Sequence, residues 1–188
     1  MRALIVYESM YGNTRRVAEA IGRGLGNGGS SPDVAVVPVT AAADQRAADW
    51  DLLVVGGPTH IHGMSREATR RSAVDVARSP GSGLDMEPGA SDGGLREWLE
   101  SLQMDGGKAA VFATRADGPA LFTGSAAKGL AKALHHHGFE LVAEPESFLV
   151  DGQPHLLAGE EQRAQQWGQS LATRLGVVTP QLPTPDER

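Results

Sequence analysis

The residues of this chain best suited to chemistry form a short polar loop directly after its first apolar run. The run 3–6 reads Ala-Leu-Ile-Val, and the loop 7–14 reads Tyr-Glu-Ser-Met-Tyr-Gly-Asn-Thr. Ser9 and Thr14 bring hydroxyl donors, and Gly12 lets the backbone come close to a ligand. A helix that begins after such a loop presents unpaired backbone N–H groups, and its dipole favours an anion there. The pattern therefore predicts a phosphate-binding loop.

The composition of this loop excludes two common kinds of phosphate loop. The P-loop of nucleotide triphosphatases needs G-x-x-x-x-G-K-(S/T), but this loop contains no lysine or arginine before Arg15. The dinucleotide fingerprint G-x-G-x-x-G is absent because Glu8, Met10 and Tyr11 occupy the places of its glycines. Neutral dipoles would then hold the phosphate, which suits a monoester better than a triphosphate with magnesium. An ordinary strand–turn–helix connection stays open as the alternative.

Composition and charge narrow the class of protein. The 188 residues suffice for one α/β domain, and a net charge of −6 offers no basic face to nucleic acid. The absence of cysteine excludes disulfides, thiol catalysis and cysteine-ligated metal centres. The chain shows no signal peptide and no apolar run of membrane-spanning length. We therefore expect a cytoplasmic protein that has neither a membrane nor a nucleic acid as partner.

Strand and helix patterns alternate along the chain. The predicted strands are 2–7, 33–39, 51–56, 108–114 and 139–150, the last interrupted near Pro145, and the predicted helices are 14–25, 66–77, 94–102, 125–137 and 159–175. The segment Ser79–Asp92, rich in Gly, Ser and Pro, is predicted to be a mobile surface loop. Five strands separated by helices predict an α/β fold with a doubly wound parallel sheet and helices on both faces. We expect one domain, 1–178, followed by a flexible tail, 179–188.

Two further loops lie where such a sheet binds its ligands, beyond the carboxyl ends of the strands. Gly56–Ser65 follows the third predicted strand and is punctuated by glycine, and Thr114–Phe122 follows the fourth and contains a Gly-Pro turn. With loop 9–14, which matches (S/T)-x-(S/T)-G-x-(S/T) except at Tyr11, they resemble the FMN-binding flavodoxin family. Section 126–150 is similar to short bacterial members. The resemblance covers nearly the whole chain and implies the strand order 2-1-3-4-5.

The resemblance also implies a cofactor and a set of binding residues. In flavodoxins the first loop holds the phosphate of FMN, and the other two loops clamp its isoalloxazine ring. Carried over to this chain, the phosphate-binding residues are Ser9, Met10, Tyr11, Gly12, Asn13 and Thr14. The ring-binding residues are Pro58, Thr59, His60, Ile61, His62 and Gly63 on one side and Thr114, Arg115, Asp117 and Gly118 on the other.

The chain departs from the family at the ring end. Typical flavodoxins hold the ring between a Trp and a Tyr, whereas His60, His62 and Phe122 are the nearest substitutes here. Three hypotheses follow: a flavodoxin-like protein that transfers electrons to a redox partner protein, an FMN-dependent NAD(P)H:quinone-type oxidoreductase, and a flavodoxin-fold interaction module that has lost FMN. The Ser-Met-Tyr-Gly stretch resembles flavodoxin-like quinone reductases, which favours the second, but their second loop usually begins Pro-Thr-Arg.

Several other residues invite a functional interpretation. His60 and His62 lack a carboxylate or cysteine at ligand spacing, so we predict no metal site there. Arg115 is interpreted as a surface charge rather than an anion-binding residue, and 135–137, His-His-His, as a solvated helix end. Trp98 and Trp167 stand at helical spacing among apolar residues and are predicted to lie in the core.

Overall fold

The structure is a computed structural model that describes residues 1–26, 33–43, 45, 49–60, 63–102, 106–118, 124–151 and 155–176. Its strands are β1 (Arg2–Tyr7), β2 (Asp33–Pro38), β3 (Leu52–Pro58), β4 (Gly107–Ala116), β5 (Phe139–Leu141) and β6 (Glu146–Val150). Its helices are α1 (Asn13–Gly26), α2 (Glu67–Arg78), α3 (Leu95–Glu100), α5 (Ala126–His136) and α6 (Glu160–Arg174), with a short 3-10 turn at Val39–Ala41. The predicted tail 179–188 lies outside the described residues.

The strands form one parallel sheet in the order β2-β1-β3-β4-β5, which confirms the predicted order and fold class. The fifth position is shared by two short strands. β5 pairs with the first part of β4, and β6 pairs with its last part. Pro145 lies between them and has no N–H to donate to the ladder, which accounts for the predicted interruption.

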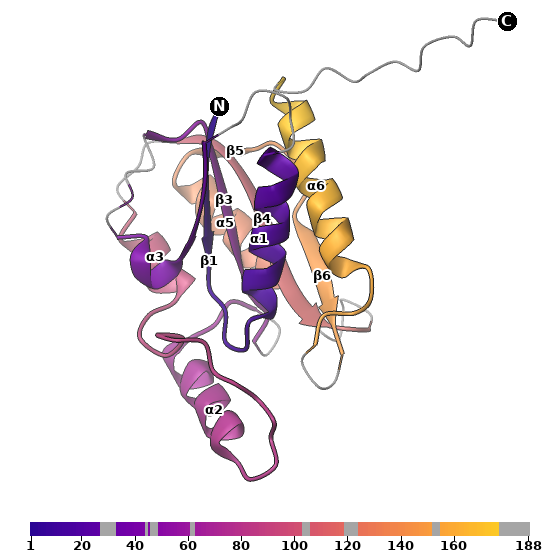
Figure 1. The fold of residues 1–188 in the computed structure, drawn as a ribbon. Helices are drawn as coiled ribbons and strands as arrows, with labels where there is room; N and C mark the ends of the chain where they lie inside the picture. Colours follow the sequence, from indigo (N-terminus) through magenta and orange to yellow (C-terminus); the bar gives the residue numbers. More distant parts are fainter. Residues whose placement is uncertain are drawn as a thin grey trace, which may run out of the picture.

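Helices cover both faces of the sheet (Figure 1). α1 and α6 pack on one face with the alternate residues Ala3 and Ile5 of β1, and α3 and α5 pack on the other with Leu4 and Val6. Every one of these side chains is fully buried, as expected for a central parallel strand. Trp98 is buried in the second core and Trp167 packs partly buried against the first, so both predicted core positions are confirmed.

α1 and α6 lie side by side at very short range (Figure 1). A Cβ atom on Gly24 of α1 would lie 2.0 Å from the carbonyl oxygen of Gln165, and one on Gly168 of α6 would lie 2.3 Å from that of Ile21. The two backbones therefore touch at positions where no other residue fits. This contact anchors the helix whose N-terminus follows the predicted phosphate loop.

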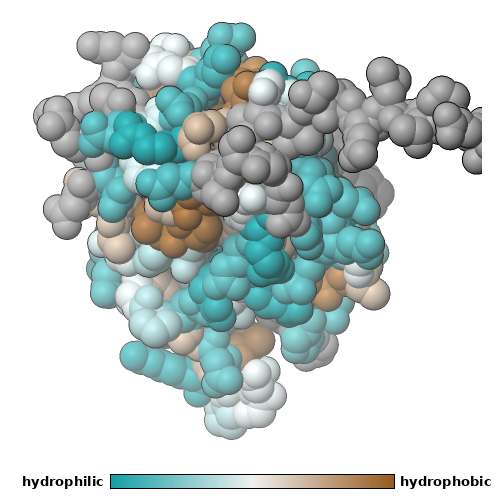
Figure 2. Space-filling view, turned by 45° about the horizontal axis from the view of Figure 1, so that its top comes forward, coloured by the Kyte–Doolittle hydropathy of each residue, from teal (hydrophilic) through white to brown (hydrophobic). Residues whose placement is uncertain are grey.

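α2 occupies a different place from the other helices. It stands beyond the carboxyl ends of the strands rather than on a face of the sheet (Figure 1). The chain then returns through residues 81–94, which form neither helix nor strand, in agreement with the predicted loop. The face of the molecule shown in Figure 2 is largely hydrophilic and carries small hydrophobic patches. No helix among the described residues is long and apolar enough to cross a bilayer.

The glycine contact predicts a position-specific loss of stability. We expect Gly24→Ala to lower the free energy of unfolding by about 1–3 kcal/mol, because the added methyl group overlaps the backbone of α6. Gly26→Ala, in the same helix but with nothing within 4 Å of its Cβ position, should cause no loss. Urea unfolding of both variants measures the difference. Equal stability of the two would contradict the close contact.

Candidate functional site

The predicted phosphate loop lies between β1 and α1, with its hydroxyl groups held in place. Gly12 has φ +88°, a conformation that favours glycine, and its N–H donates to Ser9 Oγ at 3.1 Å. The hydroxyls of Thr14 and Thr114 are hydrogen-bonded at 2.9 Å, which ties the first turn of α1 to the end of β4. The backbone N–H groups of the first turn of α1 face the same end of the sheet, as an anion site requires.

The first basic residue after the loop is neutralised by the protein itself. Arg15 Nε donates to both carboxylate oxygens of Glu87 at 3.1 Å, and its Nη1 lies 3.0 Å from Glu19 Oε1. The backbone N–H of Glu87 also donates to the carbonyl oxygen of Met10 at 2.9 Å. The segment predicted as a surface loop, Ser79–Asp92, is therefore bound to the phosphate loop. This arrangement agrees with an anion site made of neutral dipoles.

The second loop is organised by hydrogen bonds to its neighbours. The N–H of Thr59 donates to the carbonyl oxygen of Thr114 at 2.8 Å, and Thr59 Oγ1 accepts from the N–H of Ala126 at 3.1 Å. Its hydroxyl thus caps the N-terminus of α5, a role that the sequence did not indicate. His60 and Gly63 exchange two backbone hydrogen bonds of 2.8 and 3.0 Å, which close a small turn.

The three loops surround a pocket of about 440 Å³ at the carboxyl ends of the strands. Of the predicted binding residues, those that line it are Ser9, Met10, Tyr11, Asn13, Thr14, Pro58, Thr59, His60, Thr114 and Arg115. Gly12, Gly63, Asp117 and Gly118 are described but are not among the lining residues. Ile61, His62 and Phe122 lie outside the described residues. The structure thus brings residues of all three predicted loops to one cavity.

Arg115 and Gly118 show how the third loop is held. Arg115 Nη1 donates to the carbonyl oxygen of Gly118 at 2.7 Å, so the side chain folds over its own loop while lining the pocket. The N–H of Asp117 donates to the carbonyl oxygen of Val150 at 2.9 Å, which joins this loop to the end of β6. Asp117 and Gly118 therefore support the pocket from behind.

One wall of the pocket was missed by sequence reasoning. It consists of one face of α2, namely Thr69, Ser72, Ala73 and Val76. Ala116, Val150 and Asp151 complete the lining. The helix itself was predicted, but its apolar face is weak, and a weak face carries no signal for a ligand. The spacing of the four residues could have identified a common face, but only the fold shows what that face meets.

His60 is a neutral group inside the pocket. Burial and the nearby positive charge of Arg70 lower the pKa of the His60 imidazole below its ordinary value of 6.5. Among the described residues, no hydrogen-bond partner lies within reach of its Nε2 atom. At neutral pH the ring is therefore uncharged, and its Nε2 atom is buried.

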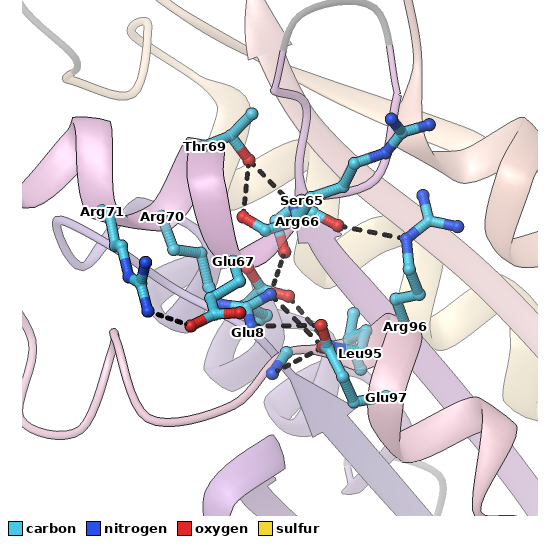
Figure 3. A network of polar contacts seen from close by, with 11 residues as sticks. Glu8, Ser65, Arg66, Glu67, Thr69, Arg70, Arg71, Leu95, Arg96 and Glu97 are labelled. Carbon is cyan, nitrogen blue, oxygen red and sulfur yellow. Dashed lines mark hydrogen bonds and ion pairs between the residues drawn. The ribbon is translucent and has the colours of Figure 1, made fainter.

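Behind the phosphate loop lies a buried charge network that the sequence analysis did not identify (Figure 3). Arg70 of α2 is 3 % exposed, and its guanidinium donates to Ser65 Oγ at 3.1 Å and to Glu97 of α3 at 3.2 and 3.3 Å. Glu8, also 3 % exposed, accepts from the N–H of Leu95 at 2.9 Å through Oε2. The network joins the phosphate loop, α2 and α3.

The glycine at the start of α3 makes room for this network. A Cβ atom on Gly94 would lie 2.2 Å from Nη1 of Arg70 and 2.9 Å from Oε2 of Glu8. Its N–H donates to Glu97 Oε2 at 3.1 Å. A larger residue here would displace the ends of two buried side chains, Arg70 and Glu8.

The two carboxylates of the network have opposite pKa shifts. Burial raises the pKa of Glu8 above its ordinary 4.5, although hydrogen bonds from Ser65 and Leu95 and the charge of Arg70 oppose this. Burial also acts to raise the pKa of Glu97, but its hydrogen bonds, chiefly with its own backbone and with Arg70, bring it below 4.5 overall. Arg70 is thus paired mainly with Glu97.

The raised pKa of Glu8 predicts a pH-dependent contribution to stability. Between pH 4.5 and its folded-state pKa, Glu8 is more protonated in the folded than in the unfolded protein. Its contribution to the free energy of unfolding therefore falls as the pH rises. Glu8→Gln removes this titration, and its amide oxygen can still accept from Leu95. We expect the free energy of unfolding of Glu8→Gln, relative to the unmodified protein, to increase between pH 4.5 and 8.

Urea unfolding at a series of pH values measures this trend. Glu100→Gln, at an exposed position of α3, controls for the loss of one carboxylate from the protein. A relative stability that decreases with pH would show instead that Arg70 stabilises an ionised Glu8.

Comparisons with known proteins agree with this geometry. An archaeal flavodoxin is 19% identical in sequence and superposes with a TM-score of 0.62, and the matched region covers 94% of this chain and 99% of the archaeal chain. Oxidised flavodoxin 1 from Bacillus cereus is 19% identical over 92% and 98% of the two chains, with a TM-score of 0.61. A WrbA-like flavodoxin from Agrobacterium tumefaciens is 19% identical over 92% and 95%, with a TM-score of 0.55. No curated protein matched.

The similarity to these solved structures shows the fold alone. The family of the chain is shown by a sequence profile. The sequence profile described as Flavodoxin matches residues 5–167, which include all three loops and every strand except the first residues of β1. The chain belongs to the flavodoxin family.

Proposed function

We propose that this protein binds FMN in the pocket between the three loops and transfers electrons to a redox partner, as an electron carrier of flavodoxin type. The observation that supports this most directly is the pocket itself, which joins an uncharged anion site to a cavity of about 440 Å³. Cavities of roughly 300–1,000 Å³ are typical of small-molecule and cofactor sites. Its position at the carboxyl ends of β1, β3 and β4 is where doubly wound sheets bind ligands.

The residues present fit the phosphate end of FMN. A phosphate monoester needs several N–H or O–H donors, and the loop offers the first turn of α1 with the hydroxyls of Ser9 and Thr14. Ser9 Oγ accepts from Gly12, which leaves its own hydrogen to donate. Because Arg15 is already paired with two carboxylates, the dianion would be held by dipoles alone.

At the other end, the protein would control the environment of the flavin. When bound, FMN supplies one- and two-electron redox chemistry. His60 lines the pocket as a neutral imidazole, so it would place no positive charge beside the flavin at neutral pH. The flavodoxins among the structural neighbours support the assignment.

The proposal predicts that FMN binds through its phosphate. The purified protein should bind FMN, measured by fluorescence titration, more tightly than riboflavin, which lacks the phosphate. Thr14→Val should weaken FMN about tenfold or more, since a hydrogen bond to a charged group contributes about 1.5–3 kcal/mol, and should leave riboflavin unchanged. Thr173→Val, near the end of α6, is the matched control. If FMN and riboflavin bind equally weakly, the assignment fails.

A second candidate is an FMN-dependent oxidoreductase that accepts hydride from NAD(P)H and reduces a quinone-type acceptor. Among the described lining residues, aromatic rings come from Tyr11 and His60 alone, and the Tyr11 hydroxyl donates to the carbonyl oxygen of Ala73 at 2.9 Å. A ring that is not covered on both sides by aromatic side chains leaves a face for a hydride donor.

Anaerobic mixing separates the two candidates. If the protein is an oxidoreductase, we expect NADH or NADPH to bleach the absorbance of bound FMN in a single turnover, and a quinone to restore it. An electron carrier should show no bleaching with either nucleotide, yet should be reduced by dithionite. Bleaching that is equally fast with free FMN in place of the protein would count against the enzymatic function.

A further inference from the structure

One exposed apolar side chain is the starting point. Among the described residues, Val76 is the large hydrophobic side chain that stays exposed, at 50% of its surface. It does not lie at random on the surface, because it lines the pocket. Exposing apolar surface inside a cavity is unfavourable unless a ligand covers it. Val76 therefore offers an apolar contact to any ligand that enters this part of the pocket.

The other α2 residues that line the pocket lie on the same face of the helix as Val76. Thr69, Ser72, Ala73 and Val76 follow the spacing i, i+3, i+4 and i+7, which places them on one face of α2. In a typical surface helix such a face packs against the core. α2 stands beyond the sheet instead, so its face is turned to the cavity (Figure 1). The face has two apolar side chains and two hydroxyls, and no charged group.

The wall has a fixed position relative to the phosphate loop. Met10 packs against Ala73, and the Tyr11 hydroxyl donates to the carbonyl oxygen of Ala73 at 2.9 Å. At the start of the helix, the buried side chain of Arg70 is bound to Ser65 and Glu97 (Figure 3). Contacts with the phosphate loop and with α3 therefore hold α2 in its place.

We propose that this face of α2 is the platform on which the isoalloxazine ring of FMN packs, in the place that an aromatic side chain has in typical flavodoxins. The inference rests on the proposed FMN site and adds the surface that positions its ring. With the phosphate at the first turn of α1, the uncharged α2 face lines the pocket together with His60 and the third loop. An aliphatic platform gives apolar contact without aromatic stacking, so it covers the ring less tightly.

Substitutions at Val76 test the platform. Because half of this side chain is exposed, its replacement should not impair folding, which circular dichroism checks. Val76→Glu should weaken both FMN and riboflavin by the same factor, about fivefold or more, because a carboxylate would lie against the ring. Val76→Trp should tighten both by about fivefold through stacking and should quench the fluorescence of the bound flavin.

Ala68 provides the matched control. It is an exposed residue of the same helix that does not line the pocket, so Ala68→Glu and Ala68→Trp should leave both affinities and the fluorescence unchanged. Binding of FMN that is insensitive to both Val76 variants would overturn the platform while leaving the FMN site intact. A change for FMN but not riboflavin would place α2 at the phosphate end and also overturn it. Failure of the unmodified protein to bind FMN would instead reject the proposed function.

Discussion

Burial of Arg70 is the constraint on which the arrangement of the site depends. Removing a guanidinium from water costs several kcal/mol unless other groups compensate, so its partners must be held nearby. They come from three parts of the chain: Glu97 from α3, Ser65 from the segment before α2, and Glu8 from the end of β1. Through them the first turn of α2 is bound to the loop after β1. A helix with a weak apolar face thereby acquires a defined place beyond the sheet (Figures 1 and 3).

The sheet brings the remaining parts of the site together. β1, β3 and β4 are neighbours and parallel, so the loops that follow them leave the same edge. Thr114 at the end of β4 joins them directly: its hydroxyl is bonded to Thr14 and its carbonyl oxygen accepts from Thr59. The first turn of α1, the proposed anion site, belongs to a helix that is held in place by the close contact of α1 with α6 at Gly24 and Gly168. A rigid scaffold thus carries loops that would have little stability alone.

Local sequence patterns predict those features of the candidate site that depend on residues close together in the sequence. The phosphate loop could be predicted because Ser9, Gly12 and Thr14 lie close together in sequence near one helix end, where Gly12 adopts a positive φ and donates to Ser9. Thr59 shows the limit of this reasoning. It was expected to contact the flavin ring, and it lines the pocket, but its hydroxyl caps α5, which begins far along the chain at Ala126. Glu8 is a second example. In the sequence it only rules out a glycine of the dinucleotide fingerprint, and nothing near it in sequence predicts that its carboxylate is buried.

The order of strands and helices, the family resemblance and the prediction of a phosphate loop without a basic residue could all be read from the amino-acid sequence, since periodicity and turn chemistry are local properties. Long-range packing places the buried side chains of Arg70 and Glu8 beside the half-exposed Glu97, and it turns Thr69, Ser72, Ala73 and Val76 toward a cavity. These facts depend on which surfaces of distant segments meet. A charged or weakly apolar helix face has the same sequence pattern whether it meets water, an ion pair or a ligand.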